Sequence, residues 1–520
     1  MTKLIDEIYN FDDTELVIGI VAAVGTDINQ VTNMIKNHLK KYNYDTEEVK
    51  LSSNVIKDIF PTLPLHSNEF QRINMFMDYG DEARKKSKNN AILALGAVNY
   101  IDSKREKEAD SLKYKKRTAY IINSLKHPEE VKMLRKIYQN GFYLVGVYCD
   151  EERRKKYLTS DQSLSHEEAE ILIKRDKSEI EKHGQQTRDT FQLSDFFITS
   201  NGKEDQLKNS VWRIFDLIFG DPFLTPTFEE FAMFTAFTSS LRSADLSRQV
   251  GSAIANNKNE IISMGANDCP KYGGGLYWPS IDDGDNEIVD APEGRDYKRG
   301  FDSNKKQLHF IIDDFLSKVN DEDIIEGIKG TNIEINISDI KEKLKIKIFK
   351  SEIKNITEYG RVVHAEMEAL LMCARNNIST KGATLYCTTF PCHNCAKHII
   401  DAGLDEVVYV EPYPKSHALD FHNDSISTNI MEKGKKVVFR PFVGIGPRRF
   451  YDLFSMTYGS GYEKIRKNEN GEKADWKHEN GTARMPLIPV SYIDIEMSAS
   501  STYEELKRSV INAENDGKEN

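Results

Sequence analysis

Two short stretches decide the fold of the second half of the chain: HAE at residues 364–366 and PCHNC at residues 391–395. Cys392 and Cys395 are three residues apart, a spacing at which two thiolates can hold one metal ion from the start of a helix. His364 adds a third ligand from an upstream segment. Three protein ligands leave the fourth position of a tetrahedral zinc site open, which is typical of catalytic sites.

Glu366 lies two residues after His364 and is not needed as a ligand. Zinc lowers the pKa of bound water from about 15.7 to about 7, and a nearby carboxylate can transfer the proton, typically for a ~10²–10⁴-fold gain. We therefore predict a zinc centre with Glu366 as proton carrier. The alternative is a structural zinc knuckle, which needs a fourth Cys or His. The local candidates are His393 and His398, and the side chain of His393 would point away from the metal.

The residues around the two stretches predict alternating strands and helices. Residues 383–389 are rich in β-favouring side chains and predict a strand that ends just before the cysteines. Residues 395–402 predict a helix that Gly403 ends, and residues 405–410 predict the next strand. Residues 365–375 predict another helix, because apolar side chains recur at helical spacing. An α/β/α sandwich follows, with two helix N-termini at the metal, where their dipoles favour anionic thiolates.

The H-x-E…P-C-x-x-C arrangement is the signature of zinc deaminases that act on cytosine or adenine. Residues 228–455 resemble the deoxycytidylate deaminase branch of the cytidine deaminase superfamily. The matching segments are SRQVGSAI at 247–254, GAN at 265–267, HAEMEA at 364–369, TTFPC at 388–392 and EPYPKS at 411–416. The resemblance implies zinc-dependent hydrolytic deamination of free deoxycytidine nucleotides, dCTP or dCMP or both, to deoxyuridine nucleotides and ammonia. It also implies that Asn267 binds the deoxyribose and that Tyr413 packs near the base.

Three basic residues are candidates for binding the substrate phosphates. Lys415 follows Tyr413 on a loop that could fold over the site, and Arg448 and Arg449 end a Gly-Ile-Gly-Pro turn whose backbone could also face phosphate. An ordinary exposed charge on a loop accounts for each of these residues as well as phosphate binding does. A long insertion at about residues 270–360 departs from the minimal deaminase pattern. It could cover the site, bind an effector or face a partner subunit.

The N-terminal half opens with an apolar segment at residues 15–24, followed by a glycine turn. This pattern predicts a buried parallel strand, a turn and a helix, which is where a phosphate-binding P-loop would lie. Gly19, Gly25, Thr26 and Asp27 are therefore candidate nucleotide-binding residues. The motif is degraded, because Thr26 stands at the position of the usual lysine and Asp27 at that of the Ser/Thr. We do not expect ordinary ATP hydrolysis.

Further strand-like segments at residues 118–124, 142–148 and 196–198 alternate with helical ones and predict a parallel sheet. Residues 15–220 as a whole resemble a P-loop kinase-like domain. With the second half, the chain resembles the bacterial two-domain anti-phage dCTP/dCMP deaminases. This resemblance implies antiviral defence by depletion of dCTP, and a homo-oligomer.

The sequence predicts a domain boundary near Gly220, where Pro222 and Pro226 follow closely. A P-loop kinase-like domain would then occupy residues 1–220 and a deaminase domain residues 221–520. A nucleotide effector at the first domain could gate the second, which requires that it bind two states with different affinities.

Composition narrows the classes of partner and compartment. The 520 residues carry a formal net charge of −11 and no long basic run, so stable binding to polymeric nucleic acid is not expected. Six cysteines show no disulfide-framework spacing, and the sequence has neither an N-terminal signal nor an apolar run of membrane-spanning length. We therefore expect a cytoplasmic protein without a membrane partner.

Two functions of other classes stay open. A tRNA or single-stranded nucleic acid base deaminase would share the zinc motif but must flip out a base, and the net acidity and the Gly-Ala-Asn segment argue against it. A non-catalytic nucleotide sensor would use the deaminase fold as a scaffold, and the complete zinc motif argues against that.

Overall fold

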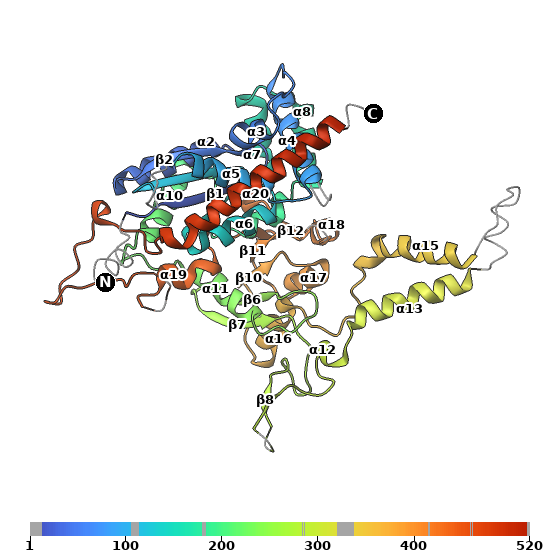
Figure 1. The fold of residues 1–520 in the computed structure, drawn as a ribbon. Coiled ribbons are helices and arrows are strands. Elements are labelled where there is room, and N and C mark those ends of the chain that lie inside the picture. The colour runs from blue at the N-terminus through green and yellow to red at the C-terminus, as the bar shows by residue number, and fades with distance from the viewer. Residues whose placement is uncertain are drawn as a thin grey trace, which may run out of the picture. The chain divides into compact units, whose positions relative to one another are not determined.

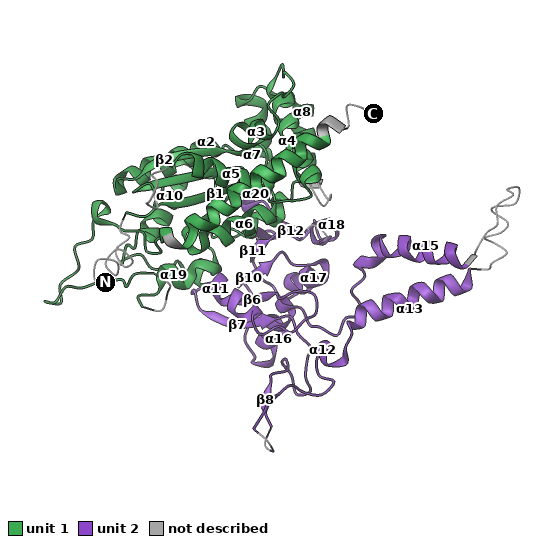
Figure 2. Cartoon of the chain, viewed as in Figure 1, with its two compact units in different colours: residues 1–231, 441–520 green, residues 232–440 purple. Residues whose placement is uncertain are grey.

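The computed structural model describes residues 13–105, 114–178, 184–282, 284, 286–319, 337–413, 416–457, 459 and 461–516. The chain divides into two compact units, coloured separately in Figure 2. Unit 1 comprises Met1–Phe231 and Pro441–Asn520, and unit 2 comprises Ala232–Arg440. Each unit has a six-stranded sheet covered by helices (Figure 1), which confirms the predicted α/β class.

The sheet of unit 1 has the strand order β14-β5-β4-β1-β3-β2, with β14 the antiparallel member. The predicted strands of the first half all appear in it and pair in parallel. Their bounds are β1 Leu16–Ala22, β2 Asp45–Lys50, β3 Thr118–Asn123, β4 Phe142–Tyr148, β5 Phe196–Thr199 and β14 Gly444–Ile445.

Helices cover both faces of this sheet. The α-helices are α2 Ile28–Leu39, α3 Lys57–Ile59, α4 Glu69–Ser87, α5 Ile92–Ser103, α6 Pro128–Tyr138, α7 Glu151–Lys156, α8 His166–Ser178, α9 Thr187–Phe191, α10 Glu204–Ile218, α11 Phe228–Ser240, α19 Phe450–Phe454 and α20 Pro489–Asp516. Helix α11 begins in unit 1 and continues into unit 2. The 3₁₀ and π turns are η1 Lys40–Tyr42, η2 Leu51–Ile56, η3 Gln139–Gly141, η4 Tyr157–Asp161, η7 Pro447–Arg449 and η8 His478–Asn480.

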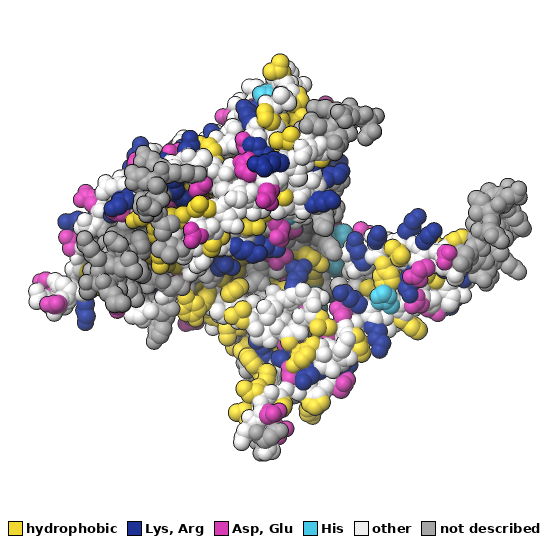
Figure 3. Space-filling view, viewed as in Figure 1, with side chains coloured by type: hydrophobic (Ala, Val, Ile, Leu, Met, Phe, Trp, Pro, Cys, Tyr) yellow, Lys and Arg dark blue, Asp and Glu magenta, His cyan; other side chains and the backbone are white. Residues whose placement is uncertain are grey.

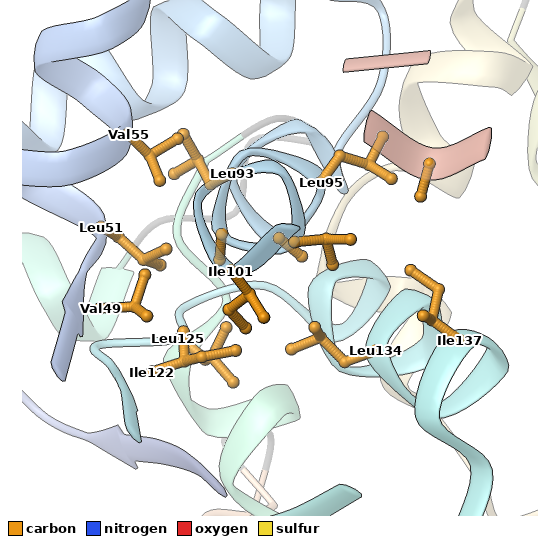
Figure 4. Close-up of a cluster of buried hydrophobic side chains, with 14 of the residues drawn as sticks. Val49, Leu51, Val55, Leu93, Leu95, Ile101, Ile122, Leu125, Leu134 and Ile137 are labelled. Atoms are coloured by element: carbon orange, nitrogen blue, oxygen red, sulfur yellow. The ribbon is translucent and has the colours of Figure 1, made fainter. Parts of the chain in front are cut away.

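Strand β1 is completely buried, because its alternating side chains enter two different cores. Val17 and Val21 belong to one cluster, part of which Figure 4 shows around Leu93, Ile122 and Leu134. Leu16, Ile18 and Ile20 belong to the other. The sheet is therefore a middle layer between two helical layers.

The division into units differs from the boundary predicted near Gly220, since Pro441–Asn520 joins unit 1 rather than the deaminase half. Strand β14 extends the first sheet through Ile445 opposite Phe196. Helix α20 packs on α5 and buries Tyr492 and Tyr503 in the core of unit 1. The physical reason is tertiary, because the sequence shows an apolar helix face but not which core that face enters.

The sheet of unit 2 has the strand order β12-β13-β11-β10-β6-β7 and is mixed. Its strands are β6 Gly251–Ala255, β7 Ile261–Ala266, β10 Thr384–Thr389, β11 Glu406–Glu411, β12 Ile426–Ser427 and β13 Val437–Pro441. Its helices near the sheet are α16 Ala365–Arg375, α17 His393–Asp401 and α18 Ala418–Phe421, with the turn η6 Ile430–Glu432. These bounds agree with the strands and helices predicted around the cysteines.

The insertion at 270–360 forms a small hairpin and a helical arm. The elements are β8 Ser280–Ile281, β9 Ile288–Val289, α12 Asp296–Arg299, α13 Ser303–Lys318, α15 Ile337–Phe349 and η5 Glu352–Asn355. Helices α13 and α15 pack together through a Lys345–Asp313 ion pair of 2.6 Å. Figure 3 shows charged side chains of both signs along this arm. Among the described residues, none of the helices combines the length and the apolar character needed to cross a lipid bilayer.

Candidate metal centre

Two helix N-termini bring the predicted zinc ligands together in unit 2. His364 is the N-cap residue of α16, Cys392 is that of α17, and Cys395 lies in the first turn of α17. The Nδ1 atom of His364 lies 3.4 Å from Sγ of Cys392 and 3.3 Å from Sγ of Cys395. The cluster also lies where both helix dipoles present their positive ends, which favours thiolates.

Residues of the second sheet hold His364 in place. Asp268 follows β7 and forms a two-way backbone bridge to Val363, with N–O distances of 3.2 and 3.0 Å. The hydroxyl of Ser252 donates to the carbonyl of Ala365 over 2.7 Å. These bonds fix the entry of α16 on both sides of the histidine.

Gly265 lets α16 approach strand β7 closely. A Cβ atom at this position would lie 2.0 Å from the carbonyl oxygen of Ala365 and 2.6 Å from the amide nitrogen of Ala369. Both neighbours are helix backbone, which cannot move aside as a flexible side chain can. The glycine of the Gly-Ala-Asn segment is therefore a packing requirement of the site.

The donor set fits zinc. Two sulfur atoms and one imidazole nitrogen are ligands that zinc prefers, and three protein ligands leave a position for reactive chemistry. In unit 2, the described residues that form a metal-competent cluster are His364, Cys392 and Cys395. His393 and His398 do not join it, so the fourth ligand of a zinc knuckle is not supplied from the described part of the chain.

Hydrogen bonding within the cluster prepares it for a cation. The bonds from Cys395 and His364 lower the pKa of Cys392 to about 4, so this residue is a thiolate at neutral pH. The bond with Cys392 raises the pKa of His364 to about 9, and the same cysteine raises that of Cys395 well above its ordinary value. Metal binding would release the protons that these groups hold.

Glu366 lies in the first turn of α16 and is only 4% exposed. Burial raises its pKa above the ordinary glutamate value, and the neighbouring His364 opposes this shift. A buried carboxyl group beside three metal-competent side chains is a group that can accept and return a proton.

Asn267 is buried, and its side chain bridges two backbone segments. Its Oδ1 atom accepts from the amide of Val250 over 2.7 Å, and its Nδ2 atom donates to the carbonyl of Arg248 over 2.9 Å. The amide thus orders the 248–250 segment. One hydrogen on Nδ2 and one lone pair on Oδ1 remain for another partner.

Tyr413 is half-buried against the core of unit 2. The guanidinium group of Arg248 lies 5.1 Å from its ring centroid and pairs with Glu411 over 2.9 Å. Ser416 ties the far end of this loop to the cysteine motif, since its hydroxyl donates to the carbonyl of Pro391 over 2.7 Å. The predicted phosphate candidate Lys415 lies outside the described residues.

Arg248 is the residue that sequence reasoning left without a role. It lies in the matching SRQVGSAI segment, and its side chain is 41% exposed next to Tyr413. The signal that could have identified Arg248 was its basic side chain within a segment that resembles the deaminase family.

The other two phosphate candidates, Arg448 and Arg449, lie in unit 1 rather than with the metal ligands in unit 2. Arg449 is 3% exposed, and its guanidinium group donates to the carbonyl of Phe142 and lies 3.3 Å from Asp195. Its side chain is bonded to residues in and next to the first sheet, because Arg449 follows β14, a strand of that sheet. Arg448 is exposed and lies 3.8 Å from the same aspartate.

Gly25, Thr26 and Asp27 follow one another in the turn after β1, whereas Gly19 lies within the strand. Gly19 lies in the middle of β1, where an added Cβ would be 2.6 Å from Leu125, so its place is explained by packing rather than by a ligand. Gly25 has a φ of +84°, which requires glycine at the turn. Asp27 caps α2, since its carboxylate accepts from the amide of Gln30 over 3.2 Å.

A cavity of about 370 Å³ opens beside this turn and includes Thr26 in its wall. Its polar groups are partly engaged by the protein. Asp176 accepts from the amide of Val24 over 3.0 Å and from Lys126 over 3.1 Å, and Lys126 also donates to the carbonyl of Ala22 over 2.7 Å. A carboxylate therefore holds one of the backbone donors that a P-loop would offer to phosphate.

Comparison with known proteins agrees with the metal centre. Residues 226–411 match the family model of the cytidine and deoxycytidylate deaminase zinc-binding region. ComE operon protein 2 of Bacillus subtilis is 47% identical over 58 residues, which are 11% of this chain and 30% of that protein. Human deoxycytidylate deaminase is 34% identical over 93 residues, which are 18% of this chain and 48% of that protein. The chain thus spans less than half the length of these relatives.

Solved structures give weaker likenesses. The apo crystal structure of dCMP deaminase from the cyanophage S-TIM5 matches 42% of this chain and 100% of its own with 17% identity and a TM-score of 0.21. Shikimate kinase from Acinetobacter baumannii matches 41% of this chain and 97% of its own with 12% identity and a TM-score of 0.24. Likeness at this level does not bear on function. Residues 226–411 therefore match a zinc-binding region of known deaminases, and zinc is the cofactor of this chain.

Proposed function

We propose that this protein deaminates free deoxycytidine nucleotides, dCTP or dCMP, to deoxyuridine nucleotides and ammonia, and that it depletes dCTP in anti-phage defence. The observation that carries the proposal is the convergence of His364, Cys392 and Cys395 beside the buried Glu366, within a segment that matches the deaminase family. The deoxycytidylate deaminases among the relatives support the nucleotide class. The net charge of −11 is consistent with a small substrate rather than a nucleic acid.

In this reaction a C–O bond forms at the ring carbon, the bond to the amino group breaks, and ammonia leaves. Zinc, when held by the three ligands, supplies the Lewis acidity that lowers the pKa of water to about 7. Glu366 accepts a proton from the attacking water and returns it toward the departing amino group. Its burial supports this role, because a raised pKa lets a carboxyl group release as well as accept the proton.

Substrate positioning is assigned to residues around Tyr413. The ring packs near the base, and Asn267 contacts the deoxyribose through the hydrogen-bonding capacity that its backbone bonds leave free. Arg248 is a candidate for phosphate contact, since it is exposed beside that ring. Lys415, which follows Tyr413 in the sequence, is a further candidate.

The proposal extends to unit 1, which we assign a nucleotide effector in the cavity beside Thr26. Lys126 and the Val24 amide could serve a phosphate there only if Asp176 releases them. Asp176→Asn should therefore strengthen nucleotide binding to unit 1, measured by calorimetry with deoxynucleoside triphosphates. Unchanged or weaker binding contradicts the assignment.

We further propose a cytoplasmic homo-oligomer.

The decisive experiment supplies the zinc-loaded protein with dCTP, dCMP, CTP and deoxyadenosine nucleotides in parallel. Ammonia release and product identity are measured. Conversion of dCTP or dCMP to its deoxyuridine counterpart is expected, and the ratio of the two rates gives the phosphate preference. No turnover on any free nucleotide, with zinc demonstrably bound, contradicts the proposal.

Glu366→Gln tests the proton-transfer role directly. The amide keeps the size of the side chain but cannot carry the proton, so kcat should fall by roughly 10²–10⁴-fold while zinc content stays unchanged. Glu368→Gln is the matched control, because Glu368 is buried on the same helix but pairs with Arg375 over 2.6 Å. An active Glu366→Gln protein would rule out the assigned role.

A further inference from the structure

Unit 1 contains a second cluster of metal-competent side chains, which the deaminase reaction does not use. His38 lies in the last turn of α2, Asp216 lies on α10, and His478 lies in η8. Their donor atoms lie within 4.8 Å of one another. The Nε2 atoms of His38 and His478 lie 2.6 and 3.4 Å from the same oxygen, Oδ1 of Asp216.

Asp216 lacks a permanently charged partner among the described residues of this cluster. Asp216 has no Lys or Arg ion-pair partner in the described part of the chain, and its side chain is 20% exposed. Its polar contacts are the two imidazole nitrogens and the hydroxyl of Tyr42, which donates over 2.5 Å. A largely buried carboxylate needs a compensating positive charge, and imidazoles supply one only when they are protonated.

The surroundings favour a fixed donor geometry. Trp212 stacks on His38 with ring centroids 5.0 Å apart and planes at 14°. Phe219 stacks on Tyr42 at 3.9 Å, and Trp476 lies 5.1 Å from His478. The aromatic rings thus hold the imidazole of His38, which is fully buried, while His478 is 39% exposed. The Tyr42 hydroxyl orients the carboxylate, as partners of a metal-binding carboxylate commonly do.

We propose that His38, Asp216 and His478 form a second zinc site, which fastens the segment around η8 to helices α2 and α10. Two imidazoles and one carboxylate are a common zinc donor set. Zinc bonds of ~2.0–2.1 Å at tetrahedral angles separate two donor atoms by roughly 3.3 Å. The His478–Asp216 distance already matches this value. The His38–Asp216 pair must widen by roughly 0.7 Å.

The proposed zinc site would anchor η8, which is too short to hold its position by itself. Residues 461–488 contain η8, a turn of three residues, as their named helical element. A metal bond from His478 to two long helices would order this segment, because metal binding contributes directly to folding free energy.

The test counts zinc in the full chain by mass spectrometry after dialysis against metal-free buffer. Wild-type protein should hold two zinc ions per chain. His478→Gln and Asp216→Asn should each hold one, and Cys392→Ser with Cys395→Ser should also leave one. His478→Gln changes a 39% exposed side chain, and Asp216→Asn keeps the shape of the carboxylate, so both should fold. One ion in the dialysed wild type, or two ions in both unit 1 variants, overturns the proposal.

Cobalt substitution separates the two sites independently of activity. Co²⁺ alone in the double cysteine variant should give visible absorption without a thiolate charge-transfer band, because the second site has nitrogen and oxygen donors. The further change His478→Gln should abolish that absorption. Zn²⁺ should also raise the Tm of the double cysteine variant and leave the Tm of the triple variant unchanged. A Tm response that survives His478→Gln overturns the proposal.

Discussion

At the scale of single residues, Lys464 is a buried amine whose charge depends on pH. It is 3% exposed and donates to the backbone carbonyls of Leu453 and Asp221. Burial lowers its pKa to about 8, and the neighbouring Arg484 adds to the shift. Because the folded-state pKa lies below the unfolded value of about 10.4, the unfolded chain binds more protons between these two pH values. The contribution of Lys464 to stability therefore rises with pH across that window.

Lys464→Met should remove this dependence. The free energy of unfolding of the wild type, relative to the variant, should increase between pH 7 and 10 by on the order of 1 kcal/mol, allowing for solvent screening. Urea unfolding of unit 1 at several pH values measures the difference. A difference that stays constant or falls with pH would show that the lysine is not neutralised by burial.

At the scale of elements, the contact between β7 and α16 decides whether the metal ligands meet. Gly265→Ala would place a methyl group 2.0 Å from the Ala365 carbonyl, so α16 must shift and carry His364 and Glu366 with it. Overpacking of this kind costs about 1–3 kcal/mol, and a misplacement of about 1 Å can cost ~10²-fold in rate. Deaminase activity and zinc affinity should therefore both fall.

Gly360→Ala is the matched control for this element. Gly360 lies shortly before α16, but its nearest neighbour would be 3.4 Å from an added Cβ, an ordinary contact. The variant should keep wild-type activity and zinc content. Equal losses in the two variants would mean that the β7–α16 contact is not what holds the site.

At the scale of the whole molecule, the last eighty residues belong to the first unit. Helix α20 joins a buried network in which Arg105 pairs with Glu15 and Glu496, and the hydroxyl of Tyr138 donates to Glu496. A chain that ends after Arg440 would leave Glu15 and Arg105 without their C-terminal partners and expose the face of α5. Breaking such a buried network is strongly destabilising.

The shortened chain should lose the cooperative unfolding of unit 1, followed by circular dichroism, while the zinc of the deaminase centre stays bound. The full chain measured in parallel is the reference. A shortened chain that unfolds cooperatively at the same urea concentration would show that α20 and β14 are dispensable.

The sequence by itself determined the local chemistry of this protein. The spacing of Cys392 and Cys395 and the motif at His364 determined the donor set. Both motifs stand at the start of a helix, where the backbone geometry depends on residues that are near in the sequence. Apolar runs likewise located the main strands, since a strand buried on both faces must be apolar throughout.

Only the tertiary structure decided which distant segments share a core. It moved Arg449 to the first sheet, made Gly19 a packing residue and brought His478 to His38, across more than four hundred residues of chain. Such contacts depend on shape and burial at long range, and amphipathic patterns record that a face is buried without recording its partner.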